Sequence, residues 1–278
     1  MGMKIGQRAN GTNKAQLTEL AEIGFDSIDY QDFIHVEGRI MQLSAEDFEA
    51  EMKAEREMIE SLGLHVGQAH GPWRYPPQDG DANMRAEWLQ YCKKAIWGTY
   101  LLGCKNMVIH PLMPTGRVDE DPVLTKQLNV EFLKALCAEG EKYGVTICLE
   151  NMPFGGQVFA RVEPMLALIK ELDLPNLRAC LDTGHSACLG DDPVEAVRML
   201  GKRYLATMHV HDNDGTHDQH AEPGTGVIDW HAYVQALREI GFEGCFSIES
   251  NTPKHLSDEG KANYQPVIFN IARRLLAE

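Results

Sequence analysis

The thirteen residues MHVHDNDGTHDQH, at positions 208–220, contain four histidines and three aspartates. Imidazole and carboxylate groups are common protein ligands of divalent metal ions. A solvated acidic loop would have the same composition, so this stretch alone does not distinguish a metal site from a loop. A metal site would need further ligands from elsewhere in the chain, and the placement of the other acidic residues and histidines therefore decides the question.

Eight short apolar or β-branched runs recur along the chain, and longer segments with helical periodicity lie between them. The expected strands are residues 3–6, 25–30, 64–70, 106–111, 145–151, 177–185, 207–212 and 244–250. The clearest helical patterns cover residues 44–63 and 121–144, and residues 262–276 would form the closing helix. Strands that alternate with helices are typical of parallel sheets with right-handed crossovers. Eight such units in 278 residues predict a (β/α)8 TIM barrel, as a single domain over residues 1–278.

Cap residues support these boundaries. Ser44 precedes a helical pattern and has Asp47 three residues later, as expected of a helix N-cap, and Asp229 holds the same position before Trp230. Five glycines follow a helical pattern and precede a strand, where a left-handed residue often ends the helix. They are Gly24, Gly63, Gly103, Gly144 and Gly241.

Acidic residues and histidines occupy the C-terminal ends of six expected strands, although buried parallel strands are otherwise apolar. They are His70, His110, Glu150, Asp182 with His185, His209 with His211, and Glu249. In a barrel these ends converge on one mouth, where active sites of this fold lie. Each residue alone could be a structural hydrogen-bonding group or a helix cap. Several of them together, unpaired, would repel and lose solvation, and a divalent cation would relieve both costs.

Glu150, Asp182, Glu249 and one imidazole are best suited to a single mixed oxygen and nitrogen site. For the imidazole we prefer His209. His211 lies two residues further along the same expected strand, so both side chains point to one side, and His211 could instead contact the substrate. No cysteine lies at these strand ends to supply a thiolate, which argues against a closed structural zinc site. Mn²⁺ is the favoured ion, with Co²⁺, Mg²⁺ and Zn²⁺ as alternatives.

Four segments carry a resemblance to a known family: CLENMP, CLDTGH, MHVHDND with the following DQHAEPGTGVIDW, and FSIES. Together they resemble the xylose-isomerase-like TIM barrels, the sugar phosphate isomerase/epimerase superfamily. The resemblance spans nearly the whole chain, and its PGTGVIDW part is especially specific. It implies that one divalent metal is bound by Glu150, Asp182, His209 and Glu249. It also implies that His185 contacts substrate oxygens.

Endonuclease IV, a trinuclear zinc enzyme that cleaves DNA at abasic sites, is a branch of the same superfamily. Its additional ligands would correspond to His70, His110, His185, Asp218 and His220, and all five residue types are present. Additional zinc ions are therefore one interpretation of Asp218 and His220, and substrate contacts are the other. The segment YLATMH also resembles that branch, which favours His209 over His211 as the primary ligand.

Net charge argues against a nucleic-acid substrate. The chain has a formal net charge of −15 and no run of Lys or Arg, whereas a nucleic-acid-binding surface needs basic residues to neutralise phosphates. We therefore expect no nucleic-acid partner. We also expect no membrane partner, because no apolar run is long enough to span a bilayer. Seven cysteines without a CxxC pair indicate a reduced cytoplasmic setting. A homo-oligomer is compatible with the sequence.

These residues and the resemblance predict a metal-dependent isomerase or epimerase of a sugar or polyol-derived ketone. Glu150 and Glu249 would remove and return a proton next to the carbonyl, through an enediolate that the metal stabilises. The expected substrate contacts are His70, His110, His185, His211, Trp73 and Arg117. Alternatives are a lyase at the same site, of the inosose dehydratase or C-glycoside-cleaving type, or a multi-zinc phosphodiesterase similar to endonuclease IV. A partner subunit without activity is a further alternative, and the presence of both glutamates argues against it.

Overall fold

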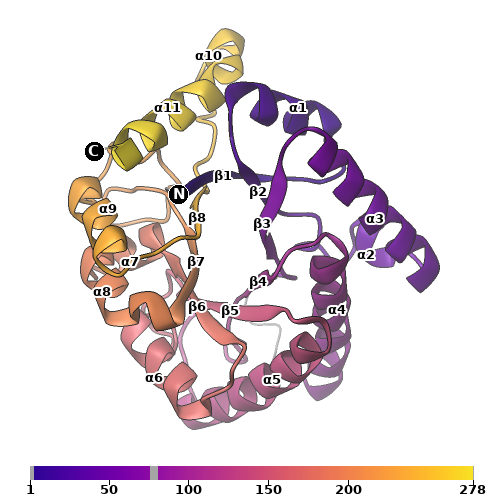
Figure 1. The fold of residues 1–278 in the computed structure, drawn as a ribbon. Helices are drawn as coiled ribbons and strands as arrows, with labels where there is room; N and C mark the ends of the chain where they lie inside the picture. The colour runs from indigo at the N-terminus through magenta and orange to yellow at the C-terminus, as the bar shows by residue number, and fades with distance from the viewer. Residues whose placement is uncertain (1–2, 76–80, 278) are drawn as a thin grey trace.

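Eight parallel strands form the centre of the molecule in the computed structural model, which describes residues 3–75 and 81–277 (Figure 1). The strands are β1 (Lys4–Ala9), β2 (Ser27–Tyr30), β3 (His65–His70), β4 (Asn106–Ile109), β5 (Thr146–Glu150), β6 (Leu177–Asp182), β7 (Leu205–His209) and β8 (Cys245–Ile248). They pair in sequence from β1 to β7, and β8 pairs with β1. A parallel bridge between Val210 and Ile248 joins the two ends. The predicted (β/α)8 barrel is confirmed.

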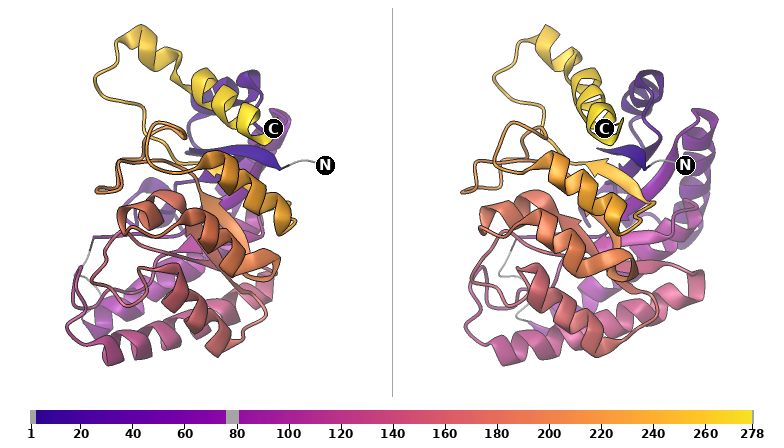
Figure 2. Two further views of the ribbon diagram at one scale, coloured as in Figure 1. Left: turned by 90° about the vertical axis from the view of Figure 1, so that its left-hand side faces the viewer. Right: turned by 60° about the vertical axis from the view of Figure 1, so that its left-hand side comes forward.

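Helices surround the strands on all sides (Figures 1 and 2). They are α1 (Lys14–Ile23), α2 (Arg39–Gln42), α3 (Ala45–Ser61), α4 (Ala82–Leu101), α5 (Pro122–Tyr143), α6 (Val162–Leu172), α7 (Thr183–Cys188), α8 (Pro193–Tyr204), α9 (Trp230–Glu239), α10 (Asp258–Ala262) and α11 (Tyr264–Ala277). The last of these, α11, contacts α1, α9 and β1, so it closes the ring of helices as expected. None of the described helices is long and apolar enough to cross a lipid bilayer.

The expected cap residues have the expected geometry. Ser44 Oγ accepts a hydrogen bond from the Asp47 N–H at 3.1 Å, and Asp229 Oδ1 accepts one from the Ala232 N–H at 3.0 Å. All five predicted glycines have φ between 66° and 108°. A side chain at these positions would be strained, which explains why glycine ends the helices there.

Two apolar layers lie on either side of the strands. The larger fills the space between strands and helices, and a smaller cluster of Val108, Cys148 and Cys180 lies separately from it. Side chains alternate along a strand, so the residues two positions later point to the same side as these three. Those residues are His110, Glu150 and Asp182. The polar groups of the barrel mouth therefore stand directly above a small apolar floor.

Several expected strand ends at the mouth were wrong, and two of them, at residues 185 and 212, lie three residues beyond the observed ends. The expected strand 177–185 ends at Asp182, because Asp182 Oδ1 accepts a hydrogen bond from the His185 N–H at 2.7 Å and starts helix α7. His185 therefore lies on α7 and not on a strand. The expected strand 207–212 ends at His209, and His211 follows it in a segment that Thr183 holds through hydrogen bonds to its backbone N–H and carbonyl.

Candidate metal centre and active site

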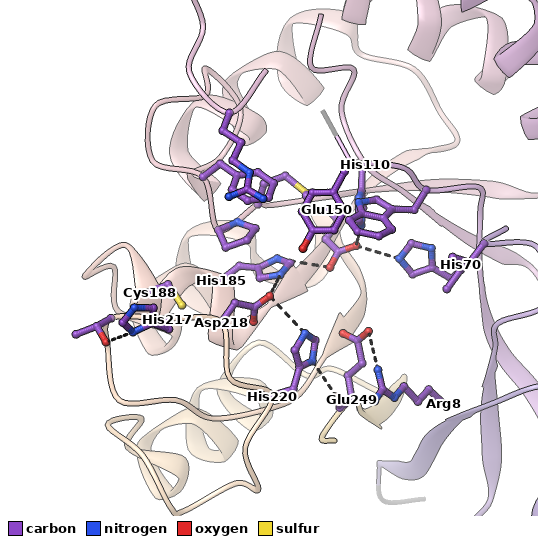
Figure 3. Close-up of a pocket in the computed structure, with 18 residues that line it drawn as sticks. Arg8, His70, His110, Glu150, His185, Cys188, His217, Asp218, His220 and Glu249 are labelled. Carbon is purple, nitrogen blue, oxygen red and sulfur yellow. Dashed lines mark hydrogen bonds and ion pairs between the residues drawn. The ribbon is translucent and has the colours of Figure 1, made fainter. Parts of the chain in front are cut away.

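A cavity of about 490 Å³ opens at the C-terminal ends of the strands (Figure 3). Nine predicted site residues line it, namely His70, Trp73, His110, Arg117, Glu150, His185, Asp218, His220 and Glu249. The remaining three predicted residues, Asp182, His209 and His211, do not line the cavity and are fully buried. The structure thus brings all twelve predicted side chains to one mouth.

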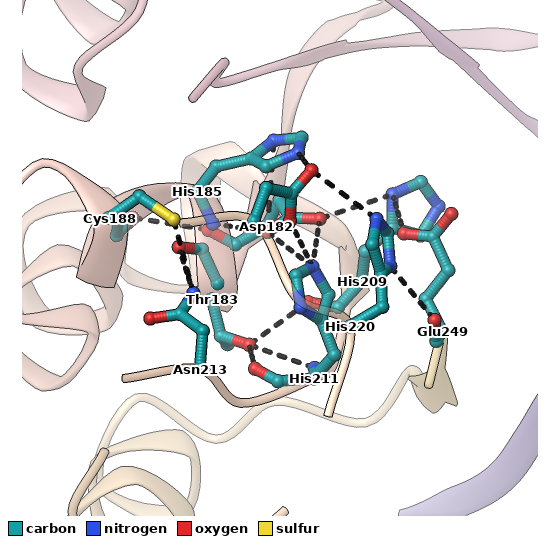
Figure 4. A network of polar contacts seen from close by, with 12 residues as sticks. Asp182, Thr183, His185, Cys188, His209, His211, Asn213, His220 and Glu249 are labelled. Carbon is teal, nitrogen blue, oxygen red and sulfur yellow. Dashed lines mark hydrogen bonds and ion pairs between the residues drawn. The ribbon is translucent and has the colours of Figure 1, made fainter. Parts of the chain in front are cut away.

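Four of these residues converge on one point, and Figure 4 shows three of them, Asp182, His209 and Glu249. His209 Nδ1 lies 2.8 Å from Glu150 Oε1, 3.4 Å from Glu249 Oε2 and 3.9 Å from Asp182 Oδ2. One ligand atom from each of the four residues lies within 4.8 Å of the others. The group comes from the ends of β5, β6 and β7 and from the residue after β8, as the barrel topology requires.

Asp29 is a member of this site that the sequence did not reveal. It lies on β2, is fully buried, and its Oδ2 atom is 2.9 Å from His209 Nε2. The same oxygen accepts a hydrogen bond from Gln68 Nε2 at 3.0 Å. Asp29 therefore holds the far nitrogen of His209, which leaves Nδ1 facing the three carboxylates. The available signal was a lone carboxylate inside the short buried strand SIDY.

A second group surrounds the other oxygen of Glu150. His110 Nε2 lies 3.0 Å and His70 Nε2 3.6 Å from Glu150 Oε2. His70 Nδ1 is 2.8 Å from the carbonyl of Gly71, so its Nε2 is the nitrogen that faces the cavity. The His70 ring also stacks on His209, with 5.5 Å between ring centroids.

A third group contains Asp218 and His220. Asp218 Oδ2 lies 3.4 Å from His185 Nε2 and 3.3 Å from His220 Nε2. His211 stacks on His220 with 4.1 Å between centroids, and its Nε2 lies 3.0 Å from Asp182. Together with Asp218, these two rings can also supply three donor atoms to one ion. The D-x-H pair thus belongs to the same mouth as the strand-end residues.

Glycine at position 184 is required by the ring of His211. A Cβ atom added to Gly184 would lie 2.0 Å from His211 Cε1. Real Cβ atoms do not approach other atoms so closely, so any larger residue would push the ring away from Asp182. The glycine of the CLDTGH segment therefore serves the placement of a site histidine.

Asp212 shapes the loop that carries Asp218 and His220. Its Oδ2 atom accepts hydrogen bonds from the N–H groups of Gly224 and Gly226, both at 3.0 Å, and from Trp230 Nε1 at 2.8 Å. This one buried carboxylate thus holds both ends of the PGTGVIDW segment. These three bonds help to fix the position of the loop.

The buried carboxylates of the cluster favour positive charge on the imidazoles beside them. Burial alone would lower the pKa of His185, but Asp182 and Asp218 outweigh it and raise that pKa to about 10. Burial likewise opposes protonation of His220, while Asp218 and Glu249 raise its pKa to about 9. For Glu249, burial favours the neutral acid, but His209 and His220 lower its pKa to about 2. Protons on the imidazoles therefore balance the buried carboxylates.

This donor set fits a divalent cation. Three buried carboxylates and one imidazole offer oxygen and nitrogen atoms around a single point, and no cysteine takes part in the four groups of candidate ligands found in residues 3–75 and 81–277. Glu150 Oε2 is buried, and its polar neighbours are the ring nitrogens His110 Nε2 at 3.0 Å and His70 Nε2 at 3.6 Å. A cation bound at the four-residue group would replace imidazole protons as the positive charge beside the carboxylates.

One part of the cavity wall is aromatic. The Trp73 ring meets Tyr75 edge-on at 4.7 Å and His110 at 5.9 Å. Arg117 lies between two rings, with its guanidinium carbon 5.2 Å from the Tyr75 centroid and 5.1 Å from that of Phe154. Such a wall suits the apolar face of a sugar ring beside polar groups that bind hydroxyls.

Two further cavity residues were missed in the sequence. Phe154 follows β5 in a loop, where an aromatic residue carries no positional signal. Arg8 belongs to β1, which extends three residues beyond its predicted end at residue 6. Its guanidinium lies 3.9 Å from Glu249 Oε1 and donates to Asn251 Oδ1.

Comparison with known proteins gives consistent matches. A family model described as xylose isomerase-like TIM barrel matches residues 17–267. An uncharacterized protein of Methanocaldococcus jannaschii is 32% identical over 193 residues, which cover 67% of this chain and 63% of that protein. Inosose isomerase of Bacillus subtilis is 26% identical over 160 residues, covering 55% and 56% of the two chains. A probable endonuclease 4 of Acholeplasma laidlawii is 24% identical over 196 residues, 66% of each chain.

Solved structures share the whole architecture. D-psicose 3-epimerase from Clostridium cellulolyticum H10, crystallised with D-tagatose, superimposes with a TM-score of 0.80 at 18% identity, over 99% of both chains. At this identity the similarity shows a common fold. The matched part of the chain spans 56% to 63% of the length of the first two relatives described above.

Proposed function

Because this chain belongs to the xylose isomerase-like TIM barrel family, as the match over residues 17–267 shows, we propose that it is a divalent-metal-dependent isomerase or epimerase of a sugar or polyol-derived ketone. One observation carries the proposal. Two carboxylates, Glu150 and Glu249, flank His209 Nδ1 at 2.8 and 3.4 Å and both border the cavity. The names of inosose isomerase and D-psicose 3-epimerase support this class of reaction.

Glu150, Asp182, His209 and Glu249 would hold the metal, and we propose Mn²⁺, with Co²⁺, Mg²⁺ and Zn²⁺ as alternatives. The bound ion would supply positive charge beside a carbonyl oxygen and a neighbouring hydroxyl, which stabilises the negative charge that develops when the adjacent carbon loses a proton.

The two glutamates would carry the proton. One of them accepts the proton from the carbon next to the carbonyl, and the C–H electron pair moves toward the carbonyl oxygen. The other glutamate, or the same one, returns a proton to the opposite face or to the neighbouring carbon. The first outcome is epimerisation and the second is isomerisation. Buried His209, together with His110 at Glu150 and His220 at Glu249, lowers the pKa of both carboxyl groups against the opposing effect of burial, so both are bases near neutral pH.

Other side chains would bind and shield the substrate. His185 and His220 offer ring N–H groups to substrate hydroxyls, and Trp73 with Tyr75 covers an apolar ring face and excludes water. His70 and His110 line the cavity beside Glu150, and His211 lies beside Asp182, so these three rings would fix the orientation of the two carboxylates. A lyase would begin with the same proton abstraction and differ only in the loss of a leaving group, so product analysis separates the two reactions.

A multi-metal phosphodiesterase is the second candidate, and a specific observation favours it. Beyond the four-residue group, His70 and His110 surround Glu150, while His185 and His220 surround Asp218. These positions would allow two further zinc ions. The charge opposes a DNA substrate, because the chain carries a net −15 and the described cavity wall contains only Arg8 and Arg117 as arginine or lysine side chains.

A single set of assays separates these functions. The Mn²⁺-loaded protein is incubated in D₂O with ketoses, inososes and glycosides, and deuterium in the recovered sugar is measured by mass spectrometry. Exchange next to a carbonyl that is lost in Glu150→Gln and Glu249→Gln is the expected result. Absence of exchange with every compound, together with cleavage of an abasic-site duplex and about three zinc ions per chain, would replace the proposal with the phosphodiesterase.

We also propose a cytoplasmic setting. No disulfide joins any of the seven cysteines, all of which lie in the described residues, and five of them are buried. Buried free thiols are common in proteins of reducing compartments. A small-molecule carbohydrate is the proposed partner, and a homo-oligomer would be compatible with it.

A further inference from the structure

A second cavity adjoins the first one. Its volume is about 420 Å³, and it lies over β1, between the segments that follow β1, β2 and β8. Arg8 and Ile34 line both cavities, so these two side chains form the boundary between them. We name this second cavity the side pocket. None of the proposed metal ligands or proton carriers lines it, and the proposed reaction gives it no role.

We propose that the side pocket binds a second hydroxyl-rich unit, so that the substrate is a glycoside or another extended neutral carbohydrate. This inference rests on the proposed function and names the substrate class of that site. It requires three properties of the side pocket. The lining must match neutral hydroxyl groups, some polar atoms must lack protein partners, and the pocket must lie beside the reacting centre.

The lining of the side pocket is rich in side-chain amides. Gln7, Gln16, Gln31 and Gln265 all contribute, together with Ser250 and Thr252. An amide offers two donors and an acceptor, and a sugar hydroxyl both donates and accepts, so the two are matched partners. Ionised ligands are matched less well, because Arg8 is the lining's one permanently charged side chain among the described residues and already contacts Glu249 and Asn251.

One polar atom in each of two amide groups at this pocket has no hydrogen-bond partner among the described residues. Gln7 is only 2% exposed, and its Nε2 donates to Gln265 Oε1 at 3.0 Å, while its Oε1 makes no hydrogen bond to any residue that the structure describes. Gln31 Nε2 is likewise buried without one in the described chain. Buried polar atoms nearly always have a partner in a functioning protein. Rotation of the Gln31 amide about its terminal bond would present it to a ligand hydroxyl, whereas Gln7 would first have to give up its bond to Gln265.

Arg8 connects the side pocket to the reacting centre. Figure 3 shows Arg8 beside Glu249 at the edge of the first cavity, with 3.9 Å between Nη1 and Oε1. A sugar whose reacting carbon faces Glu249 would therefore direct a substituent on that side past Arg8 and Ile34. Ile34 offers an apolar surface at the crossing, where the glycosidic linkage would lie.

The test compares one ketose with its glycosides. D-Fructose and its three glucosyl derivatives turanose, maltulose and palatinose are given to the Mn²⁺-loaded protein, and kcat/KM for deuterium exchange is measured alongside binding by calorimetry. We expect at least one disaccharide to have about tenfold higher kcat/KM than D-fructose, the gain of one or two hydrogen bonds. The readout is the ratio of the two kcat/KM values.

Two substitutions act on the side pocket alone. Gln31→Leu removes an amide whose Nε2 atom has no partner in the part of the chain that the structure describes, and Thr252→Trp fills the pocket from an exposed position. Both should reduce the disaccharide ratio to about one. Gln235→Leu on the exposed face of α9 is the matched control and should leave the ratio unchanged.

The outcomes separate the two proposals. Exchange of D-fructose with no advantage for any disaccharide, in kcat/KM or in binding, would overturn the side-pocket inference and leave the proposed function standing. Disaccharide binding that Thr252→Trp abolishes, without any exchange, would support the side pocket and overturn the proposed function. If none of the four sugars binds, the side-pocket inference is wrong.

Discussion

Asp29 Oδ2 lies 2.9 Å from His209 Nε2, and both side chains are fully buried inside the barrel. A carboxylate in this position fixes which imidazole nitrogen faces a metal and increases the basicity of the ligand. It also distinguishes the two histidines that follow one another near the end of β7. His209 is held so that Nδ1 faces Glu150, whereas His211 reaches only Asp182 of the four-residue group.

Asp29→Asn should therefore weaken metal binding by about 10- to 100-fold, the usual cost of losing an outer carboxylate. The amide can rotate and donate its N–H to His209 Nε2. The ring proton would then be on Nδ1, the nitrogen that faces the metal site. Mn²⁺ titration by calorimetry measures this effect without any assay of activity. Asp32→Asn, which affects a carboxylate that bonds Thr12 outside the barrel mouth, is the control. Equal affinities in the wild type and Asp29→Asn would contradict this role.

Metal binding should stabilise the fold. An ion that binds only the folded chain adds about 2.7 kcal/mol when its concentration is 100 times Kd. We expect Mn²⁺ to raise the midpoint of thermal unfolding and a chelator to reverse the shift. Asp182→Asn should remove most of this response, because Asp182 offers a ligand atom to the four-residue group. If neither metal nor chelator changes the midpoint of thermal unfolding of the wild-type protein, the group holds no ion.

Metal stoichiometry should be close to one ion per chain under the proposed function. His110→Ala and His220→Ala remove residues outside the four-residue group, so neither should lower the count. Elemental analysis after exhaustive dialysis measures it. A count near three that falls in each variant would favour the phosphodiesterase instead.

Gly184→Ala should displace His211. The added methyl group would lie 2.0 Å from Cε1 of the ring, which has no free space because it is fully buried. We expect a loss of about 1 to 3 kcal/mol in stability, typical of overpacking, together with a change of the His211 side-chain resonance. His211→Ala in the same background is the informative partner, because the smaller side chain should recover most of the lost stability. Failure of that recovery would place the strain elsewhere.

The main site residues could be predicted from the sequence because strand geometry is simple. Parallel strands of a barrel end at one mouth, so a polar residue at the end of an apolar run can be predicted to lie at that mouth. Glu150, Asp182 and His209 all lie on the last residue of their strands, and Glu249 follows the last residue of β8.

Residues outside that rule could not be found in the same way. Asp29 precedes the end of its strand by one residue and takes its role from a partner on β7. Arg8 lies beyond the predicted end of β1, and its contacts are with residues more than two hundred positions away in the chain. Such pairings depend on barrel closure. His185 was assigned to a strand because the helix start at Asp182 competes with an apolar pattern that continues through CLDTGH.

Glu55 should give the fold a pH dependence that the active site does not share. It lies on α3 among core residues, where burial raises the pKa of its carboxyl group to about 7 despite the hydrogen bond donated by Tyr30 at 2.7 Å. The folded chain thus binds this proton more tightly than the unfolded chain, in which the pKa is near its ordinary value. The stabilisation is complete below pH 4.5 and is lost as the pH rises to 7.

The expected loss is up to about 3 kcal/mol across that range, because each pH unit between the two pKa values contributes about 1.4 kcal/mol. Urea unfolding at several pH values measures it in the metal-free protein. Glu55→Gln should abolish this component, because the amide remains neutral and can still accept from Tyr30. Glu57→Gln, at an exposed position of the same helix, should retain it. If Glu55→Gln and Glu57→Gln have the same slope of stability against pH, the burial of the Glu55 carboxyl group does not control its protonation.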